Sequence, residues 1–393
     1  MLDFNNTKEN CTGCSACYAI CPRHCISMEE DNEGFLYPEL KKTEDCINCG
    51  LCEKVCPNIA IRRYVDIEQK AYVALTSNYQ IWKRSASGGA FSEICKAWGD
   101  ENTFIVGAAW NGFYLHHIGV LGVQNIQPLC NSKYISSNVE NVYAEIKKQL
   151  KERKVIFCGT PCQVSGLKSY LKKTYENLLT IDLICHGVGS PKVFMSCIDA
   201  INKQENDILK KYSFRAKRKF HEADYLTKLE FQTKTKYVIN DQYMQLFIRQ
   251  LCHRPSCGHN CIYRGKNNRQ GDFTIADFKG QRYVLPQLSG SKRNYSTVVV
   301  NSEKASLLMP ILKKNMEVYE VPLSSVIKYN SQFERQMWLS NGRDDFFEDY
   351  LRDSASAIAK WTKPFVEYKR TLKMRFFDKC PTIIRRLYLN LTK

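Results

Sequence analysis

The sequence contains two cysteine runs of identical spacing, CTGCSACYAICP at residues 11–22 and CINCGLCEKVCP at residues 46–57. Each run follows the pattern CxxCxxCxxxCP, and a proline ends each final turn. A disulfide framework and a zinc site are the alternatives, but a zinc site takes four ligands in two pairs, not two runs of four. The tight spacing indicates thiolates that wrap the backbone around one side of a bound group.

This pattern binds 4Fe-4S clusters in bacterial two-cluster ferredoxins, where the fourth cysteine of each run ligates the other cluster. Soft thiolates suit iron and sulfide, so we predict two 4Fe-4S clusters with crossed ligands. The first would be held by Cys11, Cys14, Cys17 and Cys56, and the second by Cys46, Cys49, Cys52 and Cys21. Cys25 lies outside the pattern and is expected to be a small buried residue.

The length and the cysteine content predict a multidomain protein in a reducing compartment. At 393 residues the chain is too long for a ferredoxin alone and should form two or three domains. The opening MLDFNNTKEN has no charged start followed by an apolar stretch, and no apolar run approaches the roughly 20 residues of a spanning helix. We expect a cytoplasmic protein whose 19 cysteines are metal ligands and thiols.

The charge is divided unevenly along the chain. Residues 1–62 hold ten acidic and six basic residues, a net of −4, so the other 331 residues must hold +21 for the chain to reach +17. A basic chain of this kind suits phosphorylated cofactors or substrates, an anionic membrane surface or nucleic acid. Because no zinc finger, RNP pattern or helix-turn-helix signature is present, we expect no nucleic-acid partner.

Beyond the cysteine repeat, apolar stretches typical of strands alternate with helical patterns. The strand-like stretches are 71–75, 103–110, 154–158, 178–185 and 272–278. This alternation predicts an α/β domain with a largely parallel sheet. The predicted fold is therefore an α+β ferredoxin-like two-cluster module at 1–62, an α/β domain at 63–335, and a basic helical extension at 336–393.

Three loops on this scaffold carry chemical groups. RSASGGAF at 84–91 leads into a helix, and its backbone N–H groups could cradle a phosphate, although a serine after a glycine turn is also an ordinary helix cap. VIFCGTPCQ at 155–163 and LICHGVGSP at 183–191 each follow a predicted strand. Since ligands of open α/β sheets bind beyond the carboxyl ends of strands, these two loops are expected to share one site.

A further cysteine group lies in LCHRPSCGHNCIYRG at 251–265. It contains Cys252, Cys257 and Cys261, which with Cys162 and Cys185 are enough for a third 4Fe-4S cluster. A zinc site and unligated thiols are the alternatives.

Six motifs together resemble the coenzyme F-420 hydrogenase/dehydrogenase beta subunit family, from Cys11 to about Gly280. The motifs are RSASGGAF, SKYISS at 132–137, FCGTPCQVSGLKSYL at 157–171, DLICHGVGSP at 182–191, RPSCGHNC at 254–261 and RQGDFTIADFKG at 269–280. The resemblance implies FAD in the α/β domain, a third cluster beside it, and a ferredoxin module that serves as an electron wire.

The resemblance also implies the residues of both sites. The flavin would be surrounded by Ser85, Ser87, Gly88, Gly89, Lys133, Tyr134, Gly159, Thr160, Pro161 and Gln163. The third cluster would be held by Cys162, Cys185, Cys257 and Cys261, with Cys252 as a substitute.

Two departures from the family pattern concern these sites. Cys257 and Cys261 form CxxxC where the family has CxxC, and residues 276–280 read ADFKG where it has GDFWG. Lys279 either reads an anionic substrate or is solvated. Of the histidines, His186 is the candidate for proton transfer because it follows a cofactor loop, although most isolated histidines are structural or exposed.

We expect a flavin- and iron–sulfur-dependent oxidoreductase that splits two-electron chemistry at FAD into one-electron steps along the clusters. The resemblance implies a deazaflavin as the substrate. A compound of polysaccharide biosynthesis is the other candidate, because ferredoxin-fused members of the family occur beside polysaccharide biosynthesis genes. Its partner would be a redox protein or a deazaflavin- or nicotinamide-type reductant. The alternative is a non-catalytic electron-transfer subunit that feeds a separate catalytic partner.

The C-terminal tail has its own pattern. Residues 360–393 carry ten basic and two acidic residues, and Phe365, Tyr368, Leu372 and Phe376 follow helical spacing. The pattern suits either an amphipathic helix at an anionic membrane surface, peripheral on its inner face, or a helix packed on the α/β domain.

Overall fold

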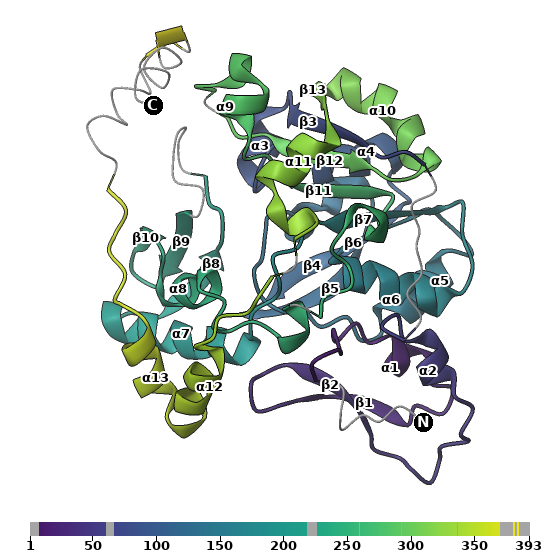
Figure 1. The fold of residues 1–393 in the computed structure, drawn as a ribbon, viewed down its shortest axis with the longest axis vertical. Helices are drawn as coiled ribbons and strands as arrows, with labels where there is room; N and C mark the ends of the chain where they lie inside the picture. The colour runs from purple at the N-terminus through teal and green to yellow at the C-terminus, as the bar shows by residue number, and fades with distance from the viewer. Residues whose placement is uncertain are drawn as a thin grey trace.

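The computed structural model describes residues 8–59, 67–217, 226–258, 260–291, 293–335, 337–369, 380–381 and 383–384. Figure 1 shows the N-terminal module, in purple, below a larger α/β domain. A second small sheet and the last described helices lie to the side of that domain.

The N-terminal module contains a hairpin and one short helix in each cysteine run. Strands β1 (Ile26–Glu30) and β2 (Leu36–Leu40) pair antiparallel, and the helices are α1 (Ala16–Ile20) and α2 (Leu51–Val55). The side chains of Ala16 and Val55 are buried in one core with α5 (Val142–Gln149) and α6 (Pro161–Leu171). The module is therefore packed directly on the α/β domain.

An eight-stranded sheet forms the centre of the α/β domain. In spatial order its strands are β13 (Met316–Val321), β3 (Lys70–Thr76), β12 (Ser296–Val300), β11 (Phe273–Asp277), β7 (Leu178–Leu183), β6 (Val155–Gly159), β4 (Phe104–Asn111) and β5 (Tyr114–Leu121). Strands β3, β4, β6, β7 and β11 run in one direction, and β5, β12 and β13 run in the other. The five that share a direction are those predicted from the sequence, and the α/β domain with a mostly parallel sheet is confirmed.

Helices cover both faces of this sheet. Ile156 and Leu179 point into a core with α4 (Ala90–Trp98) and α10 (Glu303–Asn315), while Val155 and Phe157 point into the core with α5 and α6. This alternation follows from the two-residue period of a strand. The other helices around the sheet are α3 (Tyr79–Arg84), α9 (Gln281–Val284) and α11 (Leu323–Tyr329).

A separate core forms beside the domain, on the left of Figure 1. Its antiparallel sheet has the order β10 (Thr235–Ile239), β9 (Leu226–Phe231) and β8 (Leu209–Ser213). Its helices are α7 (Pro191–Glu205), α8 (Gln242–Ile248), α12 (Arg343–Arg352) and α13 (Ser354–Trp361). The sequence reasoning had not predicted this sheet.

The C-terminal segment differs from the predicted amphipathic helix. No helix covers residues 362–369; Phe365 is buried in the side core, and the Tyr368 N–H donates to Tyr237 O at 2.7 Å. Phe365 and Tyr368 therefore do not belong to a helical stripe, because they lie in an extended segment beside β10. Leu372 and Phe376 lie outside the described residues. In the described part of the chain, no helix is both long and apolar enough to cross a membrane.

Candidate functional site

The two cysteine runs adopt the same backbone geometry. The residue before each short helix is left-handed, with φ 61° at Ser15 and 64° at Gly50. The last cysteine of each run, Cys21 or Cys56, is extended with φ −67°. Serine rarely adopts the left-handed region, so the cysteine spacing imposes one turn on two different residues.

The first crossed cysteine set is half-buried, on the side of the module that packs against α6. Cys14 and Cys17 of the first run lie within electrostatic range of Cys11 and of Cys56 from the second run. Cys14 packs against Gly166 of α6, where an added Cβ would lie 3.0 Å from Cys14 Cβ. Burial raises the pKa of the Cys14 thiol to about 12, so a bound cation is needed to keep this sulfur ionised at neutral pH.

The second crossed set faces outward. Cys21, Cys46, Cys49 and Cys52 line one cavity together with Cys25. Cys49 is exposed, whereas Cys25 is buried, as the sequence predicted. The Cys25 N–H donates to Cys21 Sγ at 3.3 Å, a contact typical of a ligating thiolate.

Both sets have the chemistry of an iron–sulfur site. Across the described residues, no group of three or more Cys, His, Asp or Glu side chains is arranged to hold a single metal ion. Thiolates that border a wider space suit a cluster, because each of its irons binds one cysteine sulfur.

The third cysteine group also comes together, at the carboxyl ends of β6 and β7. A cavity of about 40 Å³, larger than the 10–15 Å³ that one water needs, is lined by Cys162, Cys185, Cys257 and Cys261. Cys252 is not among its lining residues, because its side chain is buried in the side core. The loops at 155–163 and 183–191 therefore meet at one site, as their positions after parallel strands predicted.

Two buried arginines border the same cavity. In the described structure no hydrogen-bond acceptor lies near Arg264 Nε or near Arg269 Nε and Nη1. Such orphaned donors are costly inside a protein. A group with negative charge, such as a thiolate-ligated cluster, would satisfy them, so the donor set and its surroundings fit a third cluster.

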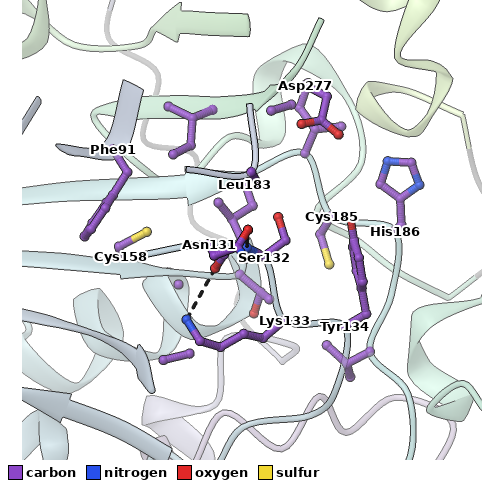
Figure 2. Close-up of a pocket in the computed structure, with 18 of the residues that line it drawn as sticks. Phe91, Asn131, Ser132, Lys133, Tyr134, Cys158, Leu183, Cys185, His186 and Asp277 are labelled. Atoms are coloured by element: carbon purple, nitrogen blue, oxygen red, sulfur yellow. Dashed lines mark hydrogen bonds between the residues drawn. The ribbon is translucent and has the colours of Figure 1, made fainter. Parts of the chain in front are cut away.

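A larger cavity adjoins this site. It has a volume of about 470 Å³, within the range of cofactor pockets. It shares Thr160, Gln163 and Cys185 with the small cavity. Figure 2 shows Cys185 and His186 on one side of it and Phe91 and Cys158 on the other.

Most residues assigned to the flavin from the sequence line the larger cavity. These are Ser85, Ser87, Gly89, Lys133, Tyr134, Gly159, Thr160 and Gln163. Gly88 and Pro161 do not line it; Pro161 lines the small cavity instead. The candidate catalytic residues His186 and Lys279 both line it.

The loop at 85–89 is held tightly against the sheet. The Gly88 N–H donates to Ser296 Oγ at 2.9 Å, and a Cβ on Gly88 would lie 2.2 Å from Ala74 O. Gly88 is therefore required for close backbone approach, and its N–H is not free for a phosphate. The expectation of free N–H groups along this loop fails at that residue.

Lys133 and the 159–163 turn have structural partners. Lys133 Nζ donates to the carbonyl oxygens of Cys130 at 2.9 Å and Asn131 at 3.3 Å, the latter drawn in Figure 2. Burial lowers the pKa of Lys133 to about 8. Thr160 and Gln163 form a capping box at the start of α6, with the Thr160 N–H donating to Gln163 Oε1 at 2.9 Å.

His186 and the acidic end of β11 form the opposite wall. Burial, and secondly the charge of Lys279, lower the pKa of His186 to about 4, so its imidazole is neutral at pH 7. Asp277 forms an ion pair with buried Arg215, which also donates to Tyr134 Oη at 3.3 Å.

Two family models match the chain. Residues 152–326 match the model that describes the C terminus of the beta subunit of coenzyme F420 hydrogenase/dehydrogenase, and residues 10–60 match the model of a 4Fe-4S dicluster domain. The family prediction is confirmed, and the chain is an iron–sulfur protein related to the F420 hydrogenase beta subunit, an oxidoreductase family. No curated protein matches the sequence.

Among solved structures, one match is a chain of the xenon-derivatized F420-reducing [NiFe] hydrogenase complex from Methanosarcina barkeri. The two chains are 13% identical, with a TM-score of 0.43, and the match covers 76% of this chain and 91% of that one.

Sequence reasoning missed the buried arginines of this beta subunit-like domain. Arg254 and Arg264 lie within the quoted cysteine stretch at 251–265 and Arg215 lies in no quoted motif, but no role was assigned to any of the three. Arg254 and Arg264 flank the cysteines of that stretch, so the sequence indicated where they would lie but not which groups they would contact.

Proposed function

We propose that the protein is an iron–sulfur flavoprotein oxidoreductase that passes electrons between FAD and three 4Fe-4S clusters. The observation that carries this is the continuity of the sites. The larger cavity shares Cys185 with the cysteine-lined cavity, and that cavity is bordered by Thr12 and Gly13 of the first ferredoxin loop. The sites therefore follow one another in the order outer set, inner set, third set and cofactor cavity. The outer set is Cys21, Cys46, Cys49 and Cys52, the inner set is Cys11, Cys14, Cys17 and Cys56, and the third set is Cys162, Cys185, Cys257 and Cys261.

FAD, when bound, exchanges electron pairs with a substrate and single electrons with clusters. The chain's own residues would orient it and exclude water. Ser85, Ser87 and Gly89 border the cavity at the start of α4, where a helix N-terminus favours an anionic group. Lys133 adds positive charge within the wall, and the side chain of Tyr134 lies beside Cys185 in Figure 2.

Proton handling falls to neutral His186 in this proposal. Its burial keeps the imidazole uncharged at neutral pH, so one ring nitrogen can accept a proton at the cavity wall. Lys279 borders the same space and is exposed, so it would face the anionic part of a substrate. The matched family's name supports a deazaflavin as that substrate; a polysaccharide-pathway compound is the second substrate class.

The alternative is an electron-transfer subunit without flavin, which feeds a catalytic partner. Exposure of Cys49 and Ile47 at the outer ferredoxin set gives a partner protein direct access in either case. The two functions differ in what the larger cavity holds.

Anaerobic purification of the full chain, with quantification of iron, sulfide and flavin, tests the proposal. We expect about twelve irons and one FAD per chain, since each of three clusters holds four irons. About eight irons with no flavin would reject the flavoenzyme and leave the electron relay.

A further inference from the structure

Arg254 occupies the junction between the ferredoxin module and the α/β domain. Its side chain is 1% exposed. Nε donates to Cys11 O at 2.8 Å, and Nη2 donates to Leu36 O at 2.9 Å and lies 3.7 Å from Cys11 Sγ. Gly13 makes room for it, because a Cβ there would lie 2.9 Å from Nη1.

The charge of this guanidinium has no carboxylate partner among the described residues. Its partners are two carbonyls, one sulfur and the ring of Tyr37, whose centroid lies 4.1 Å from Cζ. A buried cation is costly unless an opposite charge compensates it. The sulfur of Cys11 points to the missing anion, because a thiolate-ligated cluster on Cys11 carries net negative charge.

We propose that Arg254 sets the reduction potential of the cluster held by Cys11, Cys14, Cys17 and Cys56. The inference rests on the ferredoxin part of the proposed function and deepens it. When this cluster gains one electron from a protein-borne donor, no bond changes and its negative charge grows by one unit. A fixed buried cation and an N–H···S contact stabilise that more negative state, which raises the potential.

The position of Arg254 gives this effect a direction. The residue lies three positions before Cys257, and the Cys257 N–H donates to Arg254 O at 3.0 Å. The cation therefore lies between the inner ferredoxin set and the third cysteine set. By offsetting the unfavourable effect of burial on the reduced inner cluster, Arg254 keeps electrons moving inward from the outer set.

The outer set supplies an internal reference. The described residues that line its cavity include no charged side chain. Removal of the Arg254 charge should therefore change one ferredoxin potential and leave the other unchanged.

Arg343 supplies a matched control variant. It is also a buried arginine at this junction, and it donates to His253 O at 2.8 Å. In contrast to Arg254, it forms an ion pair with a carboxylate, that of Glu33. Arg343→Met should thus weaken docking of the module without moving either potential.

The experiment is a reductive titration of the full chain, followed by electron paramagnetic resonance, for the wild type, Arg254→Met, Arg254→Gln, Arg254→Lys and Arg343→Met. The electron paramagnetic resonance signal that the wild type shows and Cys14→Ala lacks is assigned to the inner cluster. In Arg254→Met, we expect the reduced-to-oxidised ratio of that cluster at fixed potential to fall at least tenfold, about 59 mV for a one-electron couple. In Arg254→Lys we expect a smaller fall.

An unchanged inner potential in Arg254→Met with full iron content would overturn the proposal, as would an equal shift in Arg343→Met. If Arg254→Met loses its iron, Arg254→Gln decides, because it keeps an N–H donor without the charge and an unchanged potential there would also overturn the proposal. The readout involves only ferredoxin clusters, so a chain without flavin or a third cluster would refute the proposed flavoenzyme and leave this test intact.

Discussion

The two cysteine runs fold alike but lie in different surroundings. Both have a left-handed residue before the helix and an extended final cysteine with the same φ. The inner set packs against α6 and Arg254, whereas the outer set includes exposed Cys49 beside Ile47, which is 62% exposed. Spacing thus determines which group is bound, and the surroundings determine its potential and its access to partners.

The largest difference is expected when each set loses one ligand. Cys14→Ala and Cys49→Ala should each lower the iron content by about four atoms, because each removes a ligand of one cluster. Cys14→Ala should also lower the melting temperature far more, since loss of the inner cluster leaves Arg254 without its counter-charge, at a cost of about 3–5 kcal/mol. Iron analysis and thermal unfolding measure both effects. An equal drop in melting temperature for the two variants would show that the inner cluster is not the counter-charge of Arg254.

A middle-sized effect is expected at the contact that buries the inner set. Gly166→Val would place side-chain atoms against Cys14 and against Tyr143 Oη, which lies 2.9 Å from the position of an added Cβ. Overpacking of this kind costs about 1–3 kcal/mol. Gly50→Asn is the control at the outer set, because nothing lies within 4 Å and asparagine tolerates its left-handed backbone. Denaturant unfolding should give a lower free energy of unfolding for Gly166→Val than for Gly50→Asn. An unchanged free energy of unfolding in Gly166→Val would show that α6 does not pack closely against Cys14.

The smallest effect is expected on the exposed surface of the outer set. Ile47→Ser should change the free energy of unfolding by no more than about 0.5 kcal/mol, because most of its side chain is already in water. Val55→Ser in the second run, where the side chain is 1% exposed, should cost several times more. Comparable losses would mean that Ile47 is covered in the folded protein.

The sequence predicted the five strands that share one direction, because each is an apolar run beside a helical pattern. It missed β5, although Asn111-Gly112 before that strand is a strong hairpin signal. It also missed β12, which lies inside the sheet between β3 and β11, and β13 at the sheet edge. Both run antiparallel to their neighbours and so do not follow the pattern of parallel strands and helices. Local pattern showed the repeating βα units but not the antiparallel strands, of which β12 is internal and β5 and β13 form the edges.

The site followed the same rule. The cysteine sets and most cavity residues were predictable, because spacing and loops after parallel strands are local features. The partners of Lys133, the use of the Gly88 N–H by Ser296, and the ion pair of Arg215 with Asp277 join segments distant in sequence. No local pattern could predict such contacts. The same is true of Arg254, whose role depends on a sulfur 243 residues away.

The most direct test of a continuous electron path is the rate at which electrons from the ferredoxin module reach the cofactor cavity. A reduced protein donor too large to enter the cavity is mixed anaerobically with the full chain, and cluster and flavin absorbance are followed in a stopped-flow instrument. In the wild type, cluster reduction should precede flavin reduction. Cys162→Ala should keep the first phase and lose the second, whereas Cys252→Ala should keep both. Full iron content and an unchanged flavin phase in Cys162→Ala would contradict the path.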